Sequence, residues 1–126
     1  MINGNTEYLE VPEEINEKGG FVWEKQSNDG LNSQGQLHSS DNRTRGGGFQ
    51  KCFLGSPTMI NNYIYFTNAL GVVYVIDSNV EKFDESAIVA INDLGEKGKT
   101  WTVNSLSFAN GNIYHRTMKE IVCIGK

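Results

Sequence analysis

Apolar residues occur in short runs along most of this chain, and turn-forming residues separate the runs. From residue 51 onward each run has strand length and is rich in Val, Ile, Phe and Tyr, which favour strands. Asn110-Gly111 between two such runs is a strong hairpin signal. The pattern therefore predicts an all-β, antiparallel chain. The expected strands are Cys52–Ile60, Tyr63–Thr67, Val72–Ile76, Ser86–Asn92, Thr100–Val103, Ser105–Ala109, Asn112–Arg116 and Ile121–Ile124.

The run Tyr63-Ile64-Tyr65-Phe66 is apolar at every position. Because successive side chains of a strand point to opposite faces, both faces of its sheet must carry bulky apolar groups. Such a sheet is stable when neighbouring sheets cover it on both sides. We therefore expect stacked sheets rather than two layers with one wet face.

The first part of the chain is mostly polar. One strand is expected at Phe21–Lys25, after the glycine pair Gly19-Gly20. Residues 26–50 are rich in Ser, Asn, Gln, Asp and Gly and close with Gly46-Gly47-Gly48, which predicts a long loop. A loop of this length in a compact domain is commonly functional or disordered.

A ten-residue pattern occurs twice. Ser56–Tyr65 and Ser105–Tyr114 share Ser, Asn, Ile and Tyr at four equivalent positions, at an offset of 49 residues. Farther along, Val73–Ile76 matches Ile121–Ile124 at an offset of 48, which predicts an intervening turn that is one residue shorter. A period of this size is typical of propeller blades.

A second element also recurs. Glu17-Lys18-Gly19 precedes Trp23 much as Glu96-Lys97-Gly98 precedes Trp101. A turn that ends in Gly and leads into a Trp-bearing strand lets a large aromatic side chain wedge between neighbouring sheets. We expect both tryptophans to serve in structural docking, with Trp101 largely buried.

The repeated segments resemble blades of the quinoprotein-like (PQQ-like) β-propeller family. The segments similar to the first three strands of a blade are Gly55–Pro57, Tyr63–Phe66 and Gly71–Asp77. Ala90–Trp101 is similar to the family's tryptophan-docking motif, although Asn92 stands at its Asp position. The resemblance implies antiparallel four-stranded propeller blades in a partial β-propeller of about two blades. Residues 1–25 would end a preceding blade, 26–50 would be a long polar loop, and 51–126 would form the last blades.

An incomplete propeller leaves sheet edges without partners, and such edges favour association. Aligned on the family, the chain starts inside a blade. We therefore expect a fragment of a longer protein that supplies upstream blades. The alternative is a ring closed by self-association.

The net charge of −4 arises from 15 acidic and 11 basic residues mixed along the chain. No basic face is offered to a phosphate backbone, so no nucleic-acid partner is expected. No apolar run has the length of a membrane span, and Met1–Glu10 lacks the pattern of a signal peptide. The compartment is left open, since a longer parent with its own signal would be periplasmic or secreted.

Residues suited to catalysis or metal binding are few and dispersed. Cys52 and Cys123 lie in apolar strand-like runs and are expected to act as small hydrophobes. Together with His38 and His115 they lack the spacing of a zinc site, and no Gly-x-Ser-x-Gly nucleophile motif occurs. His115 and Arg116 are expected to be structural. We assign no catalytic, cofactor-binding or metal-ligating residues and expect no cofactor.

The long loop is the candidate ligand site. Arginine offers a planar fork for carboxylate or phosphate, and propeller loops gather on one face of the ring. The alternative is a solvated surface insertion. The candidate residues are His38, Asp41, Asn42, Arg43 and Arg45.

The expected function is a non-catalytic β-propeller module that binds protein or carbohydrate through its loop face. The alternative implied by the family is the C-terminal part of a PQQ-dependent quinoprotein oxidoreductase, so whether the protein is an enzyme is left undecided.

Overall fold

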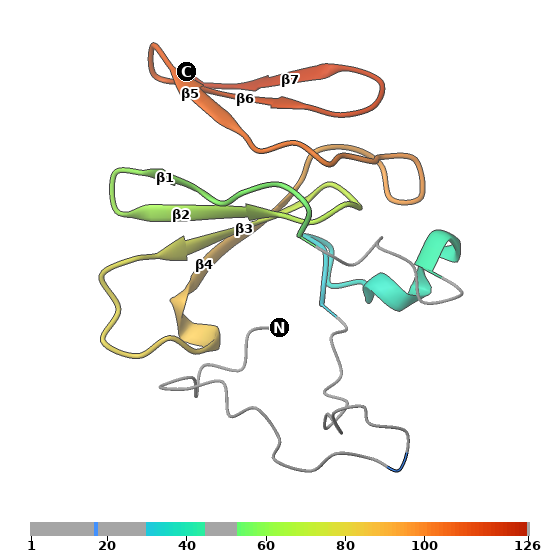
Figure 1. Ribbon diagram of the computed structural model, residues 1–126, viewed down its shortest axis with the longest axis horizontal. Helices are drawn as coiled ribbons and strands as arrows, with labels where there is room; N and C mark the ends of the chain where they lie inside the picture. The colour runs from blue at the N-terminus through green and yellow to red at the C-terminus, as the bar shows by residue number, and fades with distance from the viewer. Residues whose placement is uncertain (1–16, 18–29, 45–52, 126) are drawn as a thin grey trace.

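The computed structural model describes residue 17 and residues 30–44 and 53–125. The predicted strand Phe21–Lys25 with Trp23, as well as Arg45 and Cys52, lie outside this part. Two antiparallel sheets make up the described fold, with strand orders β1-β2-β3-β4 and β5-β6-β7 (Figure 1). Neither sheet is closed. The bounds are β1 Thr58–Ile60, β2 Tyr63–Thr67, β3 Val72–Asp77, β4 Ile88–Asp93, β5 Ser107–Ala109, β6 Asn112–Arg116 and β7 Ile121–Ile124.

The described residues contain no α-helix. Their only helical segments are three short 3₁₀ turns, η1 His38–Ser40, η2 Asn42–Thr44 and η4 Glu85–Ala87. The expected all-β class is therefore confirmed.

Several predicted strands were too long. β1 begins only at Thr58, directly after Pro57, which has no N–H to give to a ladder. β4 begins at Ile88, because the carboxylate of Asp84 accepts bonds from the backbone N and the hydroxyl of Ser86 and so caps η4. β5 begins at Ser107 rather than Ser105.

The predicted strand Thr100–Val103 was wrong. The segment runs between the two sheets, and its backbone bonds once to a turn of each, so it joins neither ladder. Its Thr102 N–H donates to the carbonyl of Ala69, 3.0 Å away, and its Trp101 carbonyl accepts from the N–H of Met118 at 2.9 Å. These bonds tie the hairpin turn of the first sheet to that of the second.

Strand register confirms the internal repeat. Thr58 pairs with Tyr65 on β1 and β2, and Ser107 pairs with Tyr114 on β5 and β6, so each residue moves by 49 positions. In the next hairpin the pairs are Thr67↔Val73 and Arg116↔Ile121. The last strand is therefore displaced by only 48 residues, as the sequence predicted.

The two sheets pack face to face around one apolar cluster. Strands β1 and β3 contribute Ile60, Val73 and Val75, and Leu106 precedes β5 on the other side. Tyr65, Ala90 and Ile113 pack against the cluster. The stacked sheets expected from the sequence are thus present on this face of the first sheet. Its opposite face meets the ring of Phe53 and the long loop instead, with Phe53 5.9 Å from Tyr74 between ring centroids.

The outward face of the second sheet is more polar than its repeat counterpart. Because Ile113 points into the core, its neighbour Tyr114 and the residues paired beside it lie on the opposite face. This face carries Ser107, Ala109, Asn112, Tyr114 and Arg116, where the first sheet has Thr58, Ile60, Tyr63, Tyr65 and Thr67.

Trp101 has intermediate exposure, and its backbone carbonyl accepts the bond from Met118 of the second sheet. Cys123 on β7 is exposed and carries a free thiol. Ile121 and Ile124 of the same strand are also exposed. The expectation that Cys123 is a buried small hydrophobe was wrong.

Candidate functional site

The described part of the long loop is folded against the first sheet. Leu31 and Leu37 form an isolated bridge, and η1 and η2 follow. The buried side chain of Asn32 closes the turn between them, because its Oδ1 accepts from the N–H groups of Gln34 and Gln36. The loop therefore presents a fixed turn of polar residues at one end of the sheets.

A buried polar chain fixes the loop to β3. Asn68 Oδ1 accepts from two backbone N–H groups, which turns its amide nitrogen toward Nδ1 of His38 at 3.3 Å. On the other side of the imidazole, Nε2 lies 3.2 Å from the Tyr74 hydroxyl, which itself donates to the carbonyl of Leu31. With Nδ1 accepting and Nε2 donating, each group in this chain has a complementary partner when His38 is neutral.

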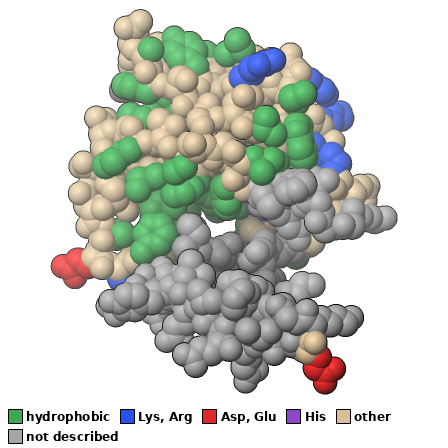
Figure 2. Space-filling view, in the orientation of Figure 1, with side chains coloured by type: hydrophobic (Ala, Val, Ile, Leu, Met, Phe, Trp, Pro, Cys, Tyr) green, Lys and Arg blue, Asp and Glu red, His purple; other side chains and the backbone are tan. Residues whose placement is uncertain are grey.

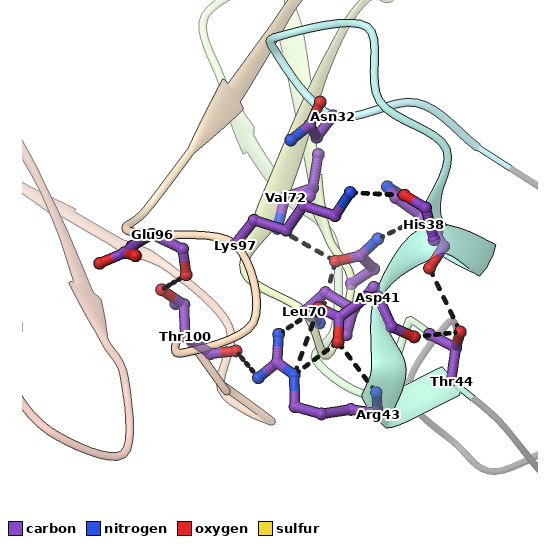
Figure 3. A network of polar contacts seen from close by, with 12 residues as sticks. Asn32, His38, Asp41, Arg43, Thr44, Leu70, Val72, Glu96, Lys97 and Thr100 are labelled. Carbon is purple, nitrogen blue, oxygen red and sulfur yellow. Dashed lines mark hydrogen bonds and ion pairs between the residues drawn. The ribbon is translucent and has the colours of Figure 1, made fainter.

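Arg43 forms an ion pair with Asp41 inside the loop and a hydrogen bond to Thr100, and this bond fixes the loop to the segment after β4 (Figure 3). Arg43 donates to both carboxylate oxygens of Asp41, with Nη2 2.7 Å from Oδ2, and its Nη1 donates to the carbonyl of Thr100. Side-chain hydrogen bonds from Arg43 lower the pKa of Asp41 to about 2, against the opposing effect of burial. The backbone N–H of Gly98 adds to the lowering.

The predicted loop residues are thus brought together in part. His38, Asp41 and Arg43 converge on the first sheet and the turn after β4, where they hold the loop in place. Asn42 is exposed, and Arg45 lies outside the described residues. The guanidinium of Arg43 is already bonded to Asp41 and Thr100, so His38, Asp41 and Arg43 serve to hold the loop in the fold.

A cleft lies between the two sheets. It has a volume of about 990 Å³, within the range of ligand sites in proteins. Tyr63 and Tyr65 of β2 line one wall, and Ile113 of β6 and Ile124 of β7 line the facing wall. The phenol ring of Tyr63 is exposed. Two tyrosines two residues apart point to the same face, about 7 Å apart along the strand.

One end of the cleft is polar, and the loop turn forms it. Ser33 donates from its hydroxyl to the carboxylate of Asp93 at 2.7 Å, which joins the loop to the end of β4. Amide side chains of Asn92, Gln34 and Gln36 also line this end. The cleft therefore combines an aromatic wall with amide and hydroxyl groups that can donate and accept hydrogen bonds.

A buried histidine closes the cleft toward the turns. Nε2 of His115 on β6 lies 3.2 Å from the hydroxyl of Thr67 on β2, and its Nδ1 lies 3.2 Å from the carbonyl of Arg116. Because burial disfavours the imidazolium, the pKa of His115 is lowered from its usual value. The expectation that His115 is structural agrees with these contacts.

The sequence analysis did not identify this cleft, although Tyr63 and Tyr65 at alternate positions of one strand were a signal for it. Of the predicted ligand residues, the four that the structure describes, His38, Asp41, Asn42 and Arg43, do not line it. Hydrophobic side chains are spread over the face seen in Figure 2, and Lys and Arg side chains gather along one edge of that view.

Among residues 30–44 and 53–125, no His, Cys, Asp or Glu side chains gather in a group that could hold a metal ion. Over the same residues, no helix is long and apolar enough to cross a membrane. No protein-family model, curated protein or solved structure matches the chain.

Proposed function

We propose that this chain is a non-catalytic binding module built from propeller-type blades, and that it takes a carbohydrate in the cleft between its two sheets. The observation that carries the proposal is the pair Tyr63 and Tyr65 on one wall of a cleft whose end is lined by amides. Aromatic faces provide apolar contact at low entropic cost, and a few placed polar groups fix orientation.

The polar groups at the mouth suit sugar hydroxyls. Gln34 and Asn92 each present both a donor and an acceptor on one planar amide, and the amide of Gln36, whose Oε1 accepts from Asn32 at 3.1 Å, adds donor hydrogens. Ser33 and Asp93 supply a hydroxyl and a carboxylate next to them. The charged residues of the lining are Asp93, Glu96 and Lys97, so carboxylates outnumber the one ammonium group, which favours an uncharged polyhydroxylated ligand over a phosphate. The long loop contributes to binding through its turn, in keeping with the expected loop face.

The test is a screen of the purified chain on immobilised glycans, followed by calorimetry on the glycans that bind. Tyr65→Ala should weaken binding at least tenfold, because a stacked ring is removed from the wall. Tyr114→Ala is the matched control. It removes the repeat-equivalent tyrosine from the outward face of the second sheet and should leave affinity unchanged.

Two outcomes would contradict the proposal. One is the absence of binding to any glycan together with binding of an extended peptide that Tyr65→Ala abolishes, which would make the cleft a peptide site. The other is glycan binding that Tyr65→Ala and Tyr114→Ala affect equally, which would place the ligand outside the cleft.

A further inference from the structure

The loop turn at the end of the cleft presents a side-chain amide whose orientation is fixed. Oδ1 of the buried Asn32 accepts from the backbone N–H groups of Gln34 and Gln36, at 3.1 and 2.8 Å. Nδ2 of Asn32 must therefore act as a donor, and it donates to Oε1 of Gln36 at 3.1 Å. Because Gln36 turns its oxygen toward Asn32, its two side-chain N–H groups are the part of the amide that is left for a ligand.

The end of β4 presents the complementary acceptor. The backbone N–H of Ser33 donates to Oδ1 of Asp93 at 3.3 Å, and the Ser33 hydroxyl donates to Oδ2 at 2.7 Å. A carboxylate has about four lone-pair sites, so each oxygen of Asp93 keeps the capacity to accept from a further donor. Asp93 and Gln36 both line the cleft and also a small cavity of about 20 Å³ behind the turn. The donor and the acceptor are therefore neighbours.

The neighbouring lysines do not pair with this carboxylate. Lys97 extends toward the loop, where its ammonium group donates to the hydroxyl of Ser40 (Figure 3). Nζ of Lys99 lies 2.8 Å from Oε2 of Glu96. Among residues 30–44 and 53–125, no ion pair includes Asp93. Asp93 thus offers a charged acceptor, which forms stronger hydrogen bonds with hydroxyl groups than a neutral acceptor does.

We infer that this end of the cleft is a subsite that recognises two adjacent hydroxyl groups of a neutral sugar ring, an inference that rests on the proposed carbohydrate binding. Hydroxyls on adjacent ring carbons are close enough together to donate to the two oxygens of Asp93. Gln36 donates from its amide nitrogen to one of these hydroxyls, which then both donates and accepts. Asn32 is the positioning residue, since it decides which half of the Gln36 amide is left for the ligand.

The subsite defines a class of ligand. A ring that lacks one of the two hydroxyls leaves an oxygen of Asp93 or an N–H of Gln36 without a partner in the complex, so it binds less tightly. A uronic acid or a sulfated sugar brings a second negative charge beside Asp93, and like charges in contact disfavour binding. The ligand class is therefore a neutral pyranose with two free adjacent hydroxyls.

NMR titration of the full chain with methyl glycosides of glucose, galactose and mannose, and with their monodeoxy analogues, tests the inference. Wild type should bind at least one of the three glycosides, and removal of either recognised hydroxyl should weaken binding about tenfold or more. Gln36→Glu keeps an acceptor for Asn32 but loses the N–H donors, so it should weaken binding of the parent glycoside by a similar factor. With the analogue that lacks the hydroxyl bound by Gln36, this variant and wild type should agree within about twofold.

The positioning role of Asn32 has its own test. In Asn32→Asp the new carboxylate still accepts from the two backbone N–H groups, but it also accepts from the amide nitrogen of Gln36. The amide oxygen of Gln36 then turns toward the ligand, so the variant should show the same loss as Gln36→Glu. Asn112→Asp is the matched control, because it adds the same charge on the outward face of the second sheet. It should leave affinity unchanged.

The outcomes separate this inference from the proposed function. If glycans bind and Tyr65→Ala weakens them, but none of the three methyl glycosides binds or Gln36→Glu has no effect, only the subsite is refuted. The subsite is also refuted if Gln36→Glu weakens parent and deoxy glycosides equally, since Gln36 would then act on the fold alone. The absence of binding to any glycan would remove the proposed function itself.

Discussion

Nε2 of His115 and Oγ1 of Thr67 lie 3.2 Å apart, and this contact joins β6 of one sheet to β2 of the other. His115 is 1% exposed and Thr67 is 7% exposed, so the contact is shielded from water. A polar pair in this position favours one alignment of the sheets, because a shift would leave Nε2 of the buried imidazole without a partner.

Stability should depend on pH through His115. Its pKa is lowered in the folded protein, so below pH 6.5 the unfolded chain binds more protons than the folded one. The free energy of unfolding should therefore fall as the pH decreases through about 6.5. His115→Phe, which installs the residue found at the equivalent Phe66, should flatten this dependence. Urea unfolding between about pH 5 and pH 8 measures both slopes. Equal slopes would refute the assignment.

Breaking the ion pair of the long loop should be costly. Arg43→Met leaves the nearly buried carboxylate of Asp41 without its main partner and should reduce the free energy of unfolding by about 3 kcal/mol. Asp41→Asn combined with Arg43→Met should be less harmful than Arg43→Met alone, because no uncompensated charge remains. Chemical denaturation of both variants measures the difference. A double variant less stable than the single one would contradict this account.

The same carboxylate should govern acid stability. The pKa of Asp41 is about 2 in the folded protein in place of 3.8. Its carboxylate therefore stabilises the fold fully above its ordinary pKa, and this stabilisation is lost as the pH falls toward 2. The shift corresponds to about 2 kcal/mol. Asp41→Asn should therefore remove part of the wild-type loss of stability between about pH 4 and pH 2. Acid titration followed by circular dichroism records it.

Two repeat-related turns should differ in how much stability is lost when the side chain that closes each turn is replaced. Oδ1 of Asn68 accepts from the N–H groups of Leu70 and Val72, while Oγ1 of Thr117 accepts from those of Lys119 and Glu120. Asn68 also holds His38. Asn68→Ala should cost about 2–3 kcal/mol, since it leaves buried donors without acceptors. Thr117→Val should cost about 1 kcal/mol. Thermal unfolding of the two variants should rank them in this order, and the reverse order would be inconsistent with the buried chain.

Trp101 should be partly accessible to solvent. Because its side chain is half-buried, acrylamide should quench its fluorescence in a Trp23→Phe background, to an extent between those of free tryptophan and a core residue. Trp101→Ala should destabilise the fold by less than the roughly 3–5 kcal/mol typical of a buried aromatic. Complete protection from acrylamide would show that the indole is covered.

Much of the fold was predictable because strands carry local signals. The apolar run Tyr63–Phe66, the Asn110-Gly111 turn and the two repeat offsets set strand positions and register without tertiary information. Asn61 and Asn110 have positive φ values of 53° and 52° at equivalent turns, a conformation that asparagine tolerates better than most residues.

The remaining features depend on contacts between distant residues. Thr100–Val103 has the composition of a strand, but its hydrogen-bond partners are two turns that come together only when the sheets stack. Similarly, Arg43 suited a ligand fork by sequence, and only the fold places the carbonyl of Thr100 beside it. The cleft arises from the separation of two sheets, which no single strand encodes.

The most direct test of the central claim is a titration of the ¹⁵N-labelled chain with a glycan, followed by amide chemical shifts. The account predicts shifts confined to the cleft, at Tyr63, Tyr65, Asn92 and the turn 32–36, and none at Tyr114 on the outward face. Shifts centred on Tyr114, or no shifts with any glycan, would contradict it.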